Sequence, residues 1–136
     1  MVDYAKYAER PNKEILMFLK VLPSDVHIYI CTGYTDMRKS IDGLADIVDG
    51  EFGFNSRAKS LFCFCGRRVN TIKIIFWDGD GYLLSLKKLE SGRMRWPRKE
   101  RQLWRLTHSG LYHLFTSKQF PEDGDVLRTF PSLNSD

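Results

Sequence analysis

The sequence predicts an α+β fold with one antiparallel sheet of about five strands and helices packed mainly on one face. The first observation is a run of four short segments of strand character between residues 61 and 97, joined by turn-forming residues. The second is a pair of segments with helical spacing, one on each side of this run. A chain of 136 residues suffices for one hydrophobic core. The expected order of elements is β-α-β-β-β-β-α.

The first elements lie before the central run. Residues 26–31 are rich in β-branched and aromatic side chains, which predicts a strand. Thr35 then offers an N-cap for a helix that begins at Asp36, where a carboxylate favours the positive end of the helix dipole. Apolar side chains recur at helical spacing from Met37 to Val48. We expect this helix to cover the core face of the sheet.

Four strands are expected in the central run. Residues 61–65 are apolar at every position, which is typical of a strand covered on both faces. Residues 71–77, 82–88 and 93–96 each alternate an apolar set of side chains with a set that contains cations. The segments between them contain Gly, Asn and Asp, which favour tight turns. We therefore expect a meander in which neighbouring strands are antiparallel.

The two ends of the chain are expected to lie outside the main domain. Residues 1–21 are interpreted as an N-terminal extension with a helix that follows Asn12 and stops at Pro23. A single domain is expected over residues 22–120. Its last element is expected to be a helix with Thr107 as the N-cap. Residues 121–136 are expected to be a mobile tail.

Positive charge is concentrated on the meander. The chain has a net charge of +4, yet residues 57–105 alone carry 13 Lys or Arg and 4 Asp or Glu. If the apolar sets share the core, Lys73, Lys87, Arg93 and Arg95 share the opposite face with Trp77. Such a face suits phosphate contacts and base stacking, although solvated surface cations are an ordinary alternative. The candidate DNA-binding residues are Arg67, Arg68, Lys73, Trp77, Lys87, Lys88, Arg93, Arg95 and Arg98.

Catalysis and metal binding have weaker support. A two-metal nuclease site would require Asp36, Asp42, Asp78 and Asp80 to meet, and nothing in their spacing requires this. The Asp-Gly-Asp-Gly segment at 78–81 resembles the start of a calcium loop, but Tyr82 occupies the third ligand position, so a hairpin turn is favoured. We expect no catalytic residue, no metal and no cofactor.

The cysteines and the hydropathy indicate the setting of the protein. Cys31, Cys63 and Cys65 lack the paired spacing of a zinc site that would include His27, and they are interpreted as reduced core thiols. No run of about 18 apolar residues is present, so we expect no membrane span and a cytoplasmic protein.

Several separated motifs resemble the TnpB accessory proteins of the insertion sequence sixty-six family. They are TGYTDMRK at 32–39, DGLA at 42–45, LF at 61–62, GRR at 66–68, IK at 72–73, WDG at 77–79, KLE at 88–90, GR at 92–93 and WP at 96–97. Ser40 departs from the family pattern, where glycine is usual, and Asn70-Thr71 replaces an acidic residue.

The resemblance implies a non-catalytic accessory role in DNA transposition, beside a separate transposase that carries out strand transfer. DNA, the transposase or both are the implied partners. The alternative is a protein-interaction adaptor that contacts only the transposase, with the basic patch meeting an acidic partner surface. The family contributes no catalytic residues to this sequence.

Overall fold

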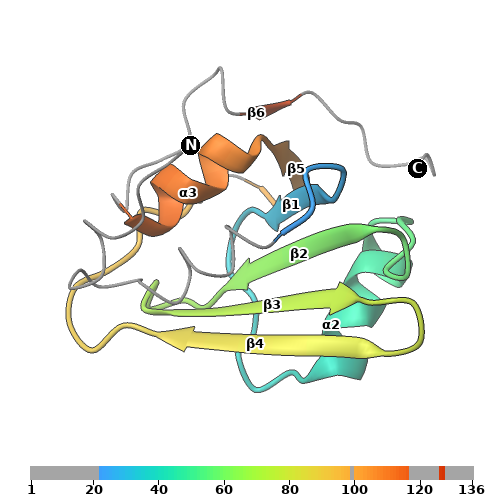
Figure 1. The fold of residues 1–136 in the computed structure, drawn as a ribbon. Helices are drawn as coiled ribbons and strands as arrows, with labels where there is room; N and C mark the ends of the chain where they lie inside the picture. Colours follow the sequence, from blue (N-terminus) through green and yellow to red (C-terminus); the bar gives the residue numbers. More distant parts are fainter. Residues whose placement is uncertain (1–21, 99, 117–125, 128–136) are drawn as a thin grey trace.

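The computed structural model describes residues 22–98, 100–116 and 126–127 (Figure 1). The expected N-terminal helix and most of the expected tail lie outside these residues. The strands are β1 His27–Cys31, β2 Ser60–Cys65, β3 Thr71–Trp77, β4 Tyr82–Lys88, β5 Leu103–Leu106 and β6 Val126–Leu127. The helices are α2 Ile41–Asp46, which continues as the π-helical segment η2 Ile47–Glu51, and α3 His108–Thr116.

The sheet is mixed, with the strand order β4-β3-β2-β1-β5-β6. β1 and β2 are parallel, whereas all other neighbouring pairs are antiparallel. The prediction of a purely antiparallel sheet was therefore wrong at this pair. Its cause is the long connection between β1 and β2, which contains a helix and so permits a parallel crossover. The prediction of a meander is confirmed for β2, β3 and β4.

Residues 93–96 do not form the expected strand. Their alternation instead reflects burial along an irregular segment, because Met94 and Trp96 are 3% and 1% exposed. The Met94 N–H donates to the Val69 carbonyl at 2.6 Å, and the Trp96 indole donates to the Cys31 carbonyl at 2.8 Å. Sequence reasoning missed two strands, β5, which pairs with the free side of β1, and β6, which pairs with β5. The two described residues of the expected tail, Val126 and Leu127, thus form a strand.

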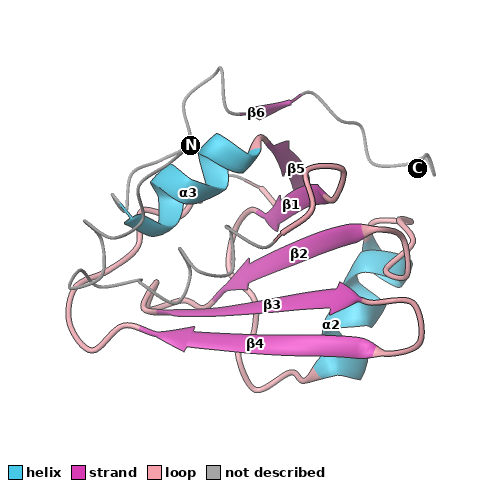
Figure 2. Cartoon of the chain, viewed as in Figure 1, coloured by secondary structure: helices cyan, strands magenta, loops and turns pink. Residues whose placement is uncertain are grey.

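Helices cover both faces of the sheet, so the prediction of helices mainly on one face was wrong (Figures 1 and 2). Leu111, Leu114 and Phe115 of α3 pack in the same cluster as Ile28 and Ile30 of β1. On the opposite face, the α2–η2 segment packs in a second cluster with the alternate side chains of the same strand. β2 is buried at every position, as its apolar run predicted, because both faces of the sheet are covered.

The helix expected from Asp36 begins later, at Ile41. Residues 36–39 form a turn in which the Asp36 carboxylate accepts the Arg38 backbone N–H at 2.9 Å. The Lys39 N–H also donates to the Asp36 carbonyl at 3.1 Å. Asp36 therefore stabilises a turn before the helix, and Thr35 is not the helix N-cap.

Candidate nucleic-acid interface

A cleft of about 520 Å³ lies at the end of the sheet where β2 ends and β3 begins. One wall is the loop after β1, and the other is the turn between β2 and β3. The lining residues are Tyr34, Thr35, Asp36, Met37, Arg38, Gly66, Arg67, Arg68, Asn70 and Thr71. Two of the motifs noted in the sequence, at 32–39 and 66–68, therefore face each other across one hollow.

The two walls are held together by backbone contacts and by the absence of a side chain at Gly66. The Thr35 N–H donates to the Cys65 carbonyl at 2.8 Å. A Cβ atom at Gly66 would lie 2.6 Å from Cγ of Met37, which is closer than real Cβ atoms approach. Lys73 adds a tie from β3, because its ammonium group donates to the Lys39 carbonyl at 2.7 Å. These contacts fix the spacing of the cleft walls.

The loop after β1 is anchored by hydrogen bonds to the segment that leads to β5. The Thr32 hydroxyl donates to the Glu100 carbonyl at 2.7 Å and accepts the Gln102 N–H at 2.9 Å. Arg101 donates to the Tyr34 carbonyl and pairs with Glu51 at 2.8 Å. Glu100 and Arg101, in the connection that follows Pro97, thereby hold the loop that forms the cleft.

One carboxylate, that of Asp36, lies within the cleft and forms an ion pair. Asp36 pairs with the guanidinium of Arg38 at 2.8 Å, and the Arg38 side chain remains 92% exposed. The side-chain and backbone hydrogen bonds from Arg38 hold the pKa of Asp36 well below its usual range. Asp36 therefore stays ionised and reduces the positive potential of the cleft.

Cations from five segments lie at the end of the sheet that contains this cleft. Arg67 and Arg68 lie in its wall and are exposed. Lys88 lies opposite Thr71 in the β3–β4 pairing, and Arg93 and Arg95 flank Met94, which is bonded to Val69 of the turn. Arg98 lies over the Tyr34 ring, with its Cζ atom 5.7 Å from the ring centroid. We call this group the basic end, defined as Arg38, Lys39, Arg67, Arg68, Lys73, Lys87, Lys88, Arg93, Arg95 and Arg98.

The single cationic face predicted from the strands is not present. Directly opposed residues of an antiparallel pair lie on the same face, and Lys87 is opposite Ile72 in the α3-side cluster. Lys73 is opposite Leu86 and lies on the α2 side. Lys73 and Lys87 therefore share an end of the sheet but project from opposite faces.

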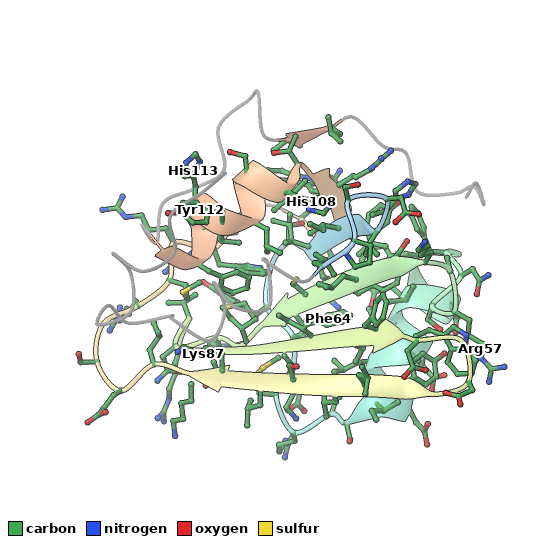
Figure 3. All side chains as sticks on the ribbon, viewed as in Figure 1. Arg57, Phe64, Lys87, His108, Tyr112 and His113 are labelled. Atoms are coloured by element: carbon green, nitrogen blue, oxygen red, sulfur yellow. The ribbon has the colours of Figure 1, made fainter. Side chains whose placement is uncertain are left out.

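Trp77 lies away from the other candidate residues. β3 runs from Thr71 at the basic end to Trp77, and six residue steps at about 3.3 Å each separate them by about 20 Å. The guanidinium of Arg57 lies 4.6 Å from the Trp77 ring centroid, and Tyr82 packs against its edge. Figure 3 shows Arg57 and Lys87 at opposite ends of the sheet. Trp77 is thus not a stacking platform among the predicted arginines.

The aspartates considered for a nuclease site lie in three different elements of the fold. Asp36 lies in the cleft, Asp42 lies in α2, and Asp78 and Asp80 form the turn between β3 and β4. The Asp78 carboxylate accepts the N–H groups of Asp80 and Gly81 at 3.2 and 3.1 Å, which confirms the predicted hairpin turn. Among the residues that the structure describes, no three His, Cys, Asp or Glu side chains are grouped to hold a metal ion.

The cysteines are buried core residues. All three are 0% exposed and reduced. Cys63 and Cys65 lie in the α3-side cluster, whereas Cys31 lies in the α2-side cluster. Burial raises the pKa of Cys31 to about 11 and of Cys65 to about 12. These thiols are poor nucleophiles and do not form one site with His27.

Sequence reasoning missed two kinds of residue at the basic end. Arg38 lines the cleft, but its position in an expected helix concealed its place opposite Arg67. Thr32, Gly66 and Arg101 build the cleft without being candidate ligands. The signal available in the sequence was that both segments, 32–39 and 66–68, carry motifs of the family that the sequence resembles. In the structure these two motifs line the same cleft.

The comparisons with known proteins decide the family. The profile described as "IS66 Orf2 like protein" matches residues 26–122, which include the whole β1–α3 unit. The chain belongs to this family. Its members are accessory proteins of IS66 insertion sequences, so the chain is a transposition-associated protein of a mobile element.

Two similar proteins come from Sinorhizobium fredii. "Uncharacterized protein y4hO" is 40% identical over 82 residues, which cover 59% of this chain and 71% of that protein. "Uncharacterized protein y4jC" is 32% identical over 72 residues, which cover 53% of this chain and 62% of that protein. No solved structure matches this IS66 Orf2-like chain. No helix in its described residues is long and apolar enough to cross a lipid bilayer.

Proposed function

We propose that this IS66 Orf2-like protein assists transposition by binding duplex DNA through the phosphate groups, with the basic end as its contact surface. The observation that carries the proposal is the presence of exposed cations from four separate segments at one end of the sheet, with Arg38, Arg67 and Arg68 lining its cleft. Phosphates are the ligands that clustered arginines and lysines recognise best, and their contacts dominate affinity for DNA.

The cleft supplies further groups suited to a polar backbone. Asn70 and Thr71 line it together with Arg67 and Arg68, and such neutral side chains commonly bond to phosphate and sugar oxygens. Tyr34 also lines it, beneath Arg98. The cleft wall formed by the loop after β1 is held in place, because Thr32 and Arg101 anchor that loop. A preformed surface of this kind loses little conformational freedom on binding.

The test is a salt titration of binding to labelled duplex DNA, measured by fluorescence anisotropy. The variant is Arg67→Ala with Arg68→Ala, and the matched control is Arg57→Ala, which removes a cation that lies over Trp77. Loss of two phosphate contacts should reduce the slope of log affinity against log salt by about 1.8. The Arg57→Ala protein should keep the wild-type slope. Equal slopes for all three proteins would remove the basic end from the proposal.

The second partner we propose is the transposase of the same element, because the chain belongs to a family of accessory proteins rather than of transposases. Comparing the element-end sequence with random DNA separates a targeting factor from a general DNA binder. Absence of binding to both DNAs at low salt, with co-purification of the transposase from nuclease-treated extract, would favour the adaptor function instead.

A further inference from the structure

Strand β4 is one edge of the sheet, and no other strand of the described residues lies beyond it. Its Leu83 and Leu86 are 55% and 61% exposed. Among the residues that the structure describes, no other large apolar residue is as exposed. Leu83 is opposite Phe76 and lies on the α3 side, whereas Leu86 is opposite Lys73 and lies on the α2 side. The edge therefore presents apolar side chains on both faces.

The backbone of β4 is arranged to pair with another strand. The Asp78 N–H donates to the Gly81 carbonyl at 3.0 Å, and the Leu89 N–H donates to the Asn70 carbonyl at 2.7 Å. With the observed register, these bonds make 83, 85 and 87 the β4 residues that bond to β3. The residues between and beside them direct their N–H and C=O groups away from the sheet. These outward residues are Tyr82, Leu84, Leu86 and Lys88.

We propose that β4 of one molecule pairs antiparallel with β4 of a second copy, about a twofold axis at Ser85. All seven residues of the strand then pair. Leu84 lies opposite Leu86 of the other copy, which places a 61% exposed leucine against an apolar side chain. A closed twofold pairing of this kind joins the two sheets and leaves neither β4 as an edge.

The charge pattern of the strand selects this arrangement. Lys87 and Lys88 lie at one end of β4, and Asp78 and Asp80 lie in the turn at its other end. Antiparallel pairing brings the lysines of each copy to the acidic turn of the other. Parallel pairing would set the lysines of the two copies side by side, which is unfavourable. The edge is thus complementary to itself in one direction only.

A cysteine at position 85 tests the register directly. Because Ser85 bonds inward to β3, the central pair of the new ladder is of the non-hydrogen-bonded type, with Cα atoms about 4.5 Å apart. That separation permits a disulfide. Ser85→Cys should form a covalent dimer under mild oxidation on a non-reducing gel, whereas Ser109→Cys on the exposed surface of α3 should not. The native cysteines do not interfere, because all three are fully buried.

The unmodified chain provides the second test. Light scattering with size-exclusion chromatography should show a concentration-dependent dimer. Leu86→Lys should raise its dissociation constant about tenfold through loss of the two symmetric leucine pairs. The melting temperature at low protein concentration should stay unchanged, because Leu86 is exposed in the monomer.

Three results would overturn the proposal, and all are independent of DNA binding. One is a chain that stays monomeric at its highest soluble concentration, with no cross-link at position 85. The other is a dimer that Leu86→Lys leaves intact, because its interface must then lie elsewhere. A position-85 cross-link formed only with a different protein would also overturn self-pairing and assign the edge to a heterologous strand.

Discussion

The two ends of the sheet contain similar side chains but use them differently. At the far end, defined as Asp25, Arg57, Lys59, Trp77, Tyr82 and the turn at 78–81, the cations are engaged within the fold. Arg57 lies over Trp77, and Lys59 pairs with Asp25 at 2.5 Å. At the basic end, Arg67 and Arg68 are exposed in the wall of a cleft. The cation that lies over Trp77 is therefore Arg57, which was not among the predicted DNA-binding residues, and the contact is one within the fold.

Tryptophan replacement should give the largest difference in stability between the two ends. Trp96 is 1% exposed and donates to the Cys31 carbonyl, so Trp96→Phe removes both a buried donor and buried volume. We expect a loss of about 2 to 3 kcal/mol in the free energy of unfolding, measured by urea denaturation. Trp77→Phe at the far end keeps a ring beneath Arg57 and should cost less than about 1 kcal/mol. Equal losses of stability for Trp96→Phe and Trp77→Phe would contradict the difference that we describe between the two tryptophans.

Glycine replacement should give the next largest difference. Gly66→Ala forces Met37 to move and should destabilise the protein by about 1 to 3 kcal/mol, with weaker DNA binding because the cleft walls separate. Gly81→Ala at the far end meets no atom within 4 Å and should be nearly neutral.

A second substitution identifies the cause of the Gly66→Ala effect. Met37→Ala in the Gly66→Ala background removes the Cγ atom that the new Cβ would meet. The double variant should recover part of the lost stability in the same urea assay. If the double variant loses as much stability as the two single variants together, or more, the contact with Met37 is not the cause of the Gly66→Ala effect.

Removal of the carboxylate in the cleft should strengthen DNA binding. Asp36→Asn leaves Arg38 without its ionic partner and adds one unit of positive charge at the basic end. We expect affinity for duplex DNA to rise about three- to fivefold at low salt, and the gain to shrink as salt increases. Asp78→Asn changes the net charge equally at the far end and should have a smaller effect. A larger effect of Asp78→Asn would place the contact surface at that end.

The smallest effect is expected in the acid dependence of stability. The pKa of Asp36 is depressed in the folded protein by Arg38, whereas an unfolded carboxyl titrates near about 3.9. Ionised Asp36 therefore contributes stability above about pH 4, and this contribution is lost as the pH falls through the folded value. Asp36→Asn should flatten the acid limb of the unfolding free energy, followed by circular dichroism. An acid limb identical to that of the wild type would show that the pair contributes nothing.

Much of the fold could be predicted from local pattern. The β2 run, the β3 and β4 alternation and the 78–81 turn are short-range features, and the structure confirms them. The parallel pairing of β1 with β2 and the position of β5 depend on which distant segments meet, and alternation carries no such information. Residues 93–96 show the limit most clearly, because Met94 and Trp96 alternate with arginines yet are buried without a strand.

The candidate site could be predicted as a composition but not as a geometry. The segment rich in cations was visible in the sequence, and most of its members do lie at one end of the sheet. Their faces depend on strand register, which separates Lys73 from Lys87. The cleft itself depends on a loop that precedes α2, and a helix expected from Asp36 concealed it.

The position of β5 has a consequence for synthesis on the ribosome. β1 lies inside the sheet, yet its second neighbour is supplied by residues 103–106, long after β2, β3 and β4 have been made. Until those residues leave the exit tunnel, β1 presents an unpaired edge of almost wholly buried residues. A nascent chain that stalls with residues 100–106 still in the tunnel therefore exposes an aggregation-prone strand and leaves Thr32 without its partners Glu100 and Gln102. Chaperone demand should be greatest in this interval of translation.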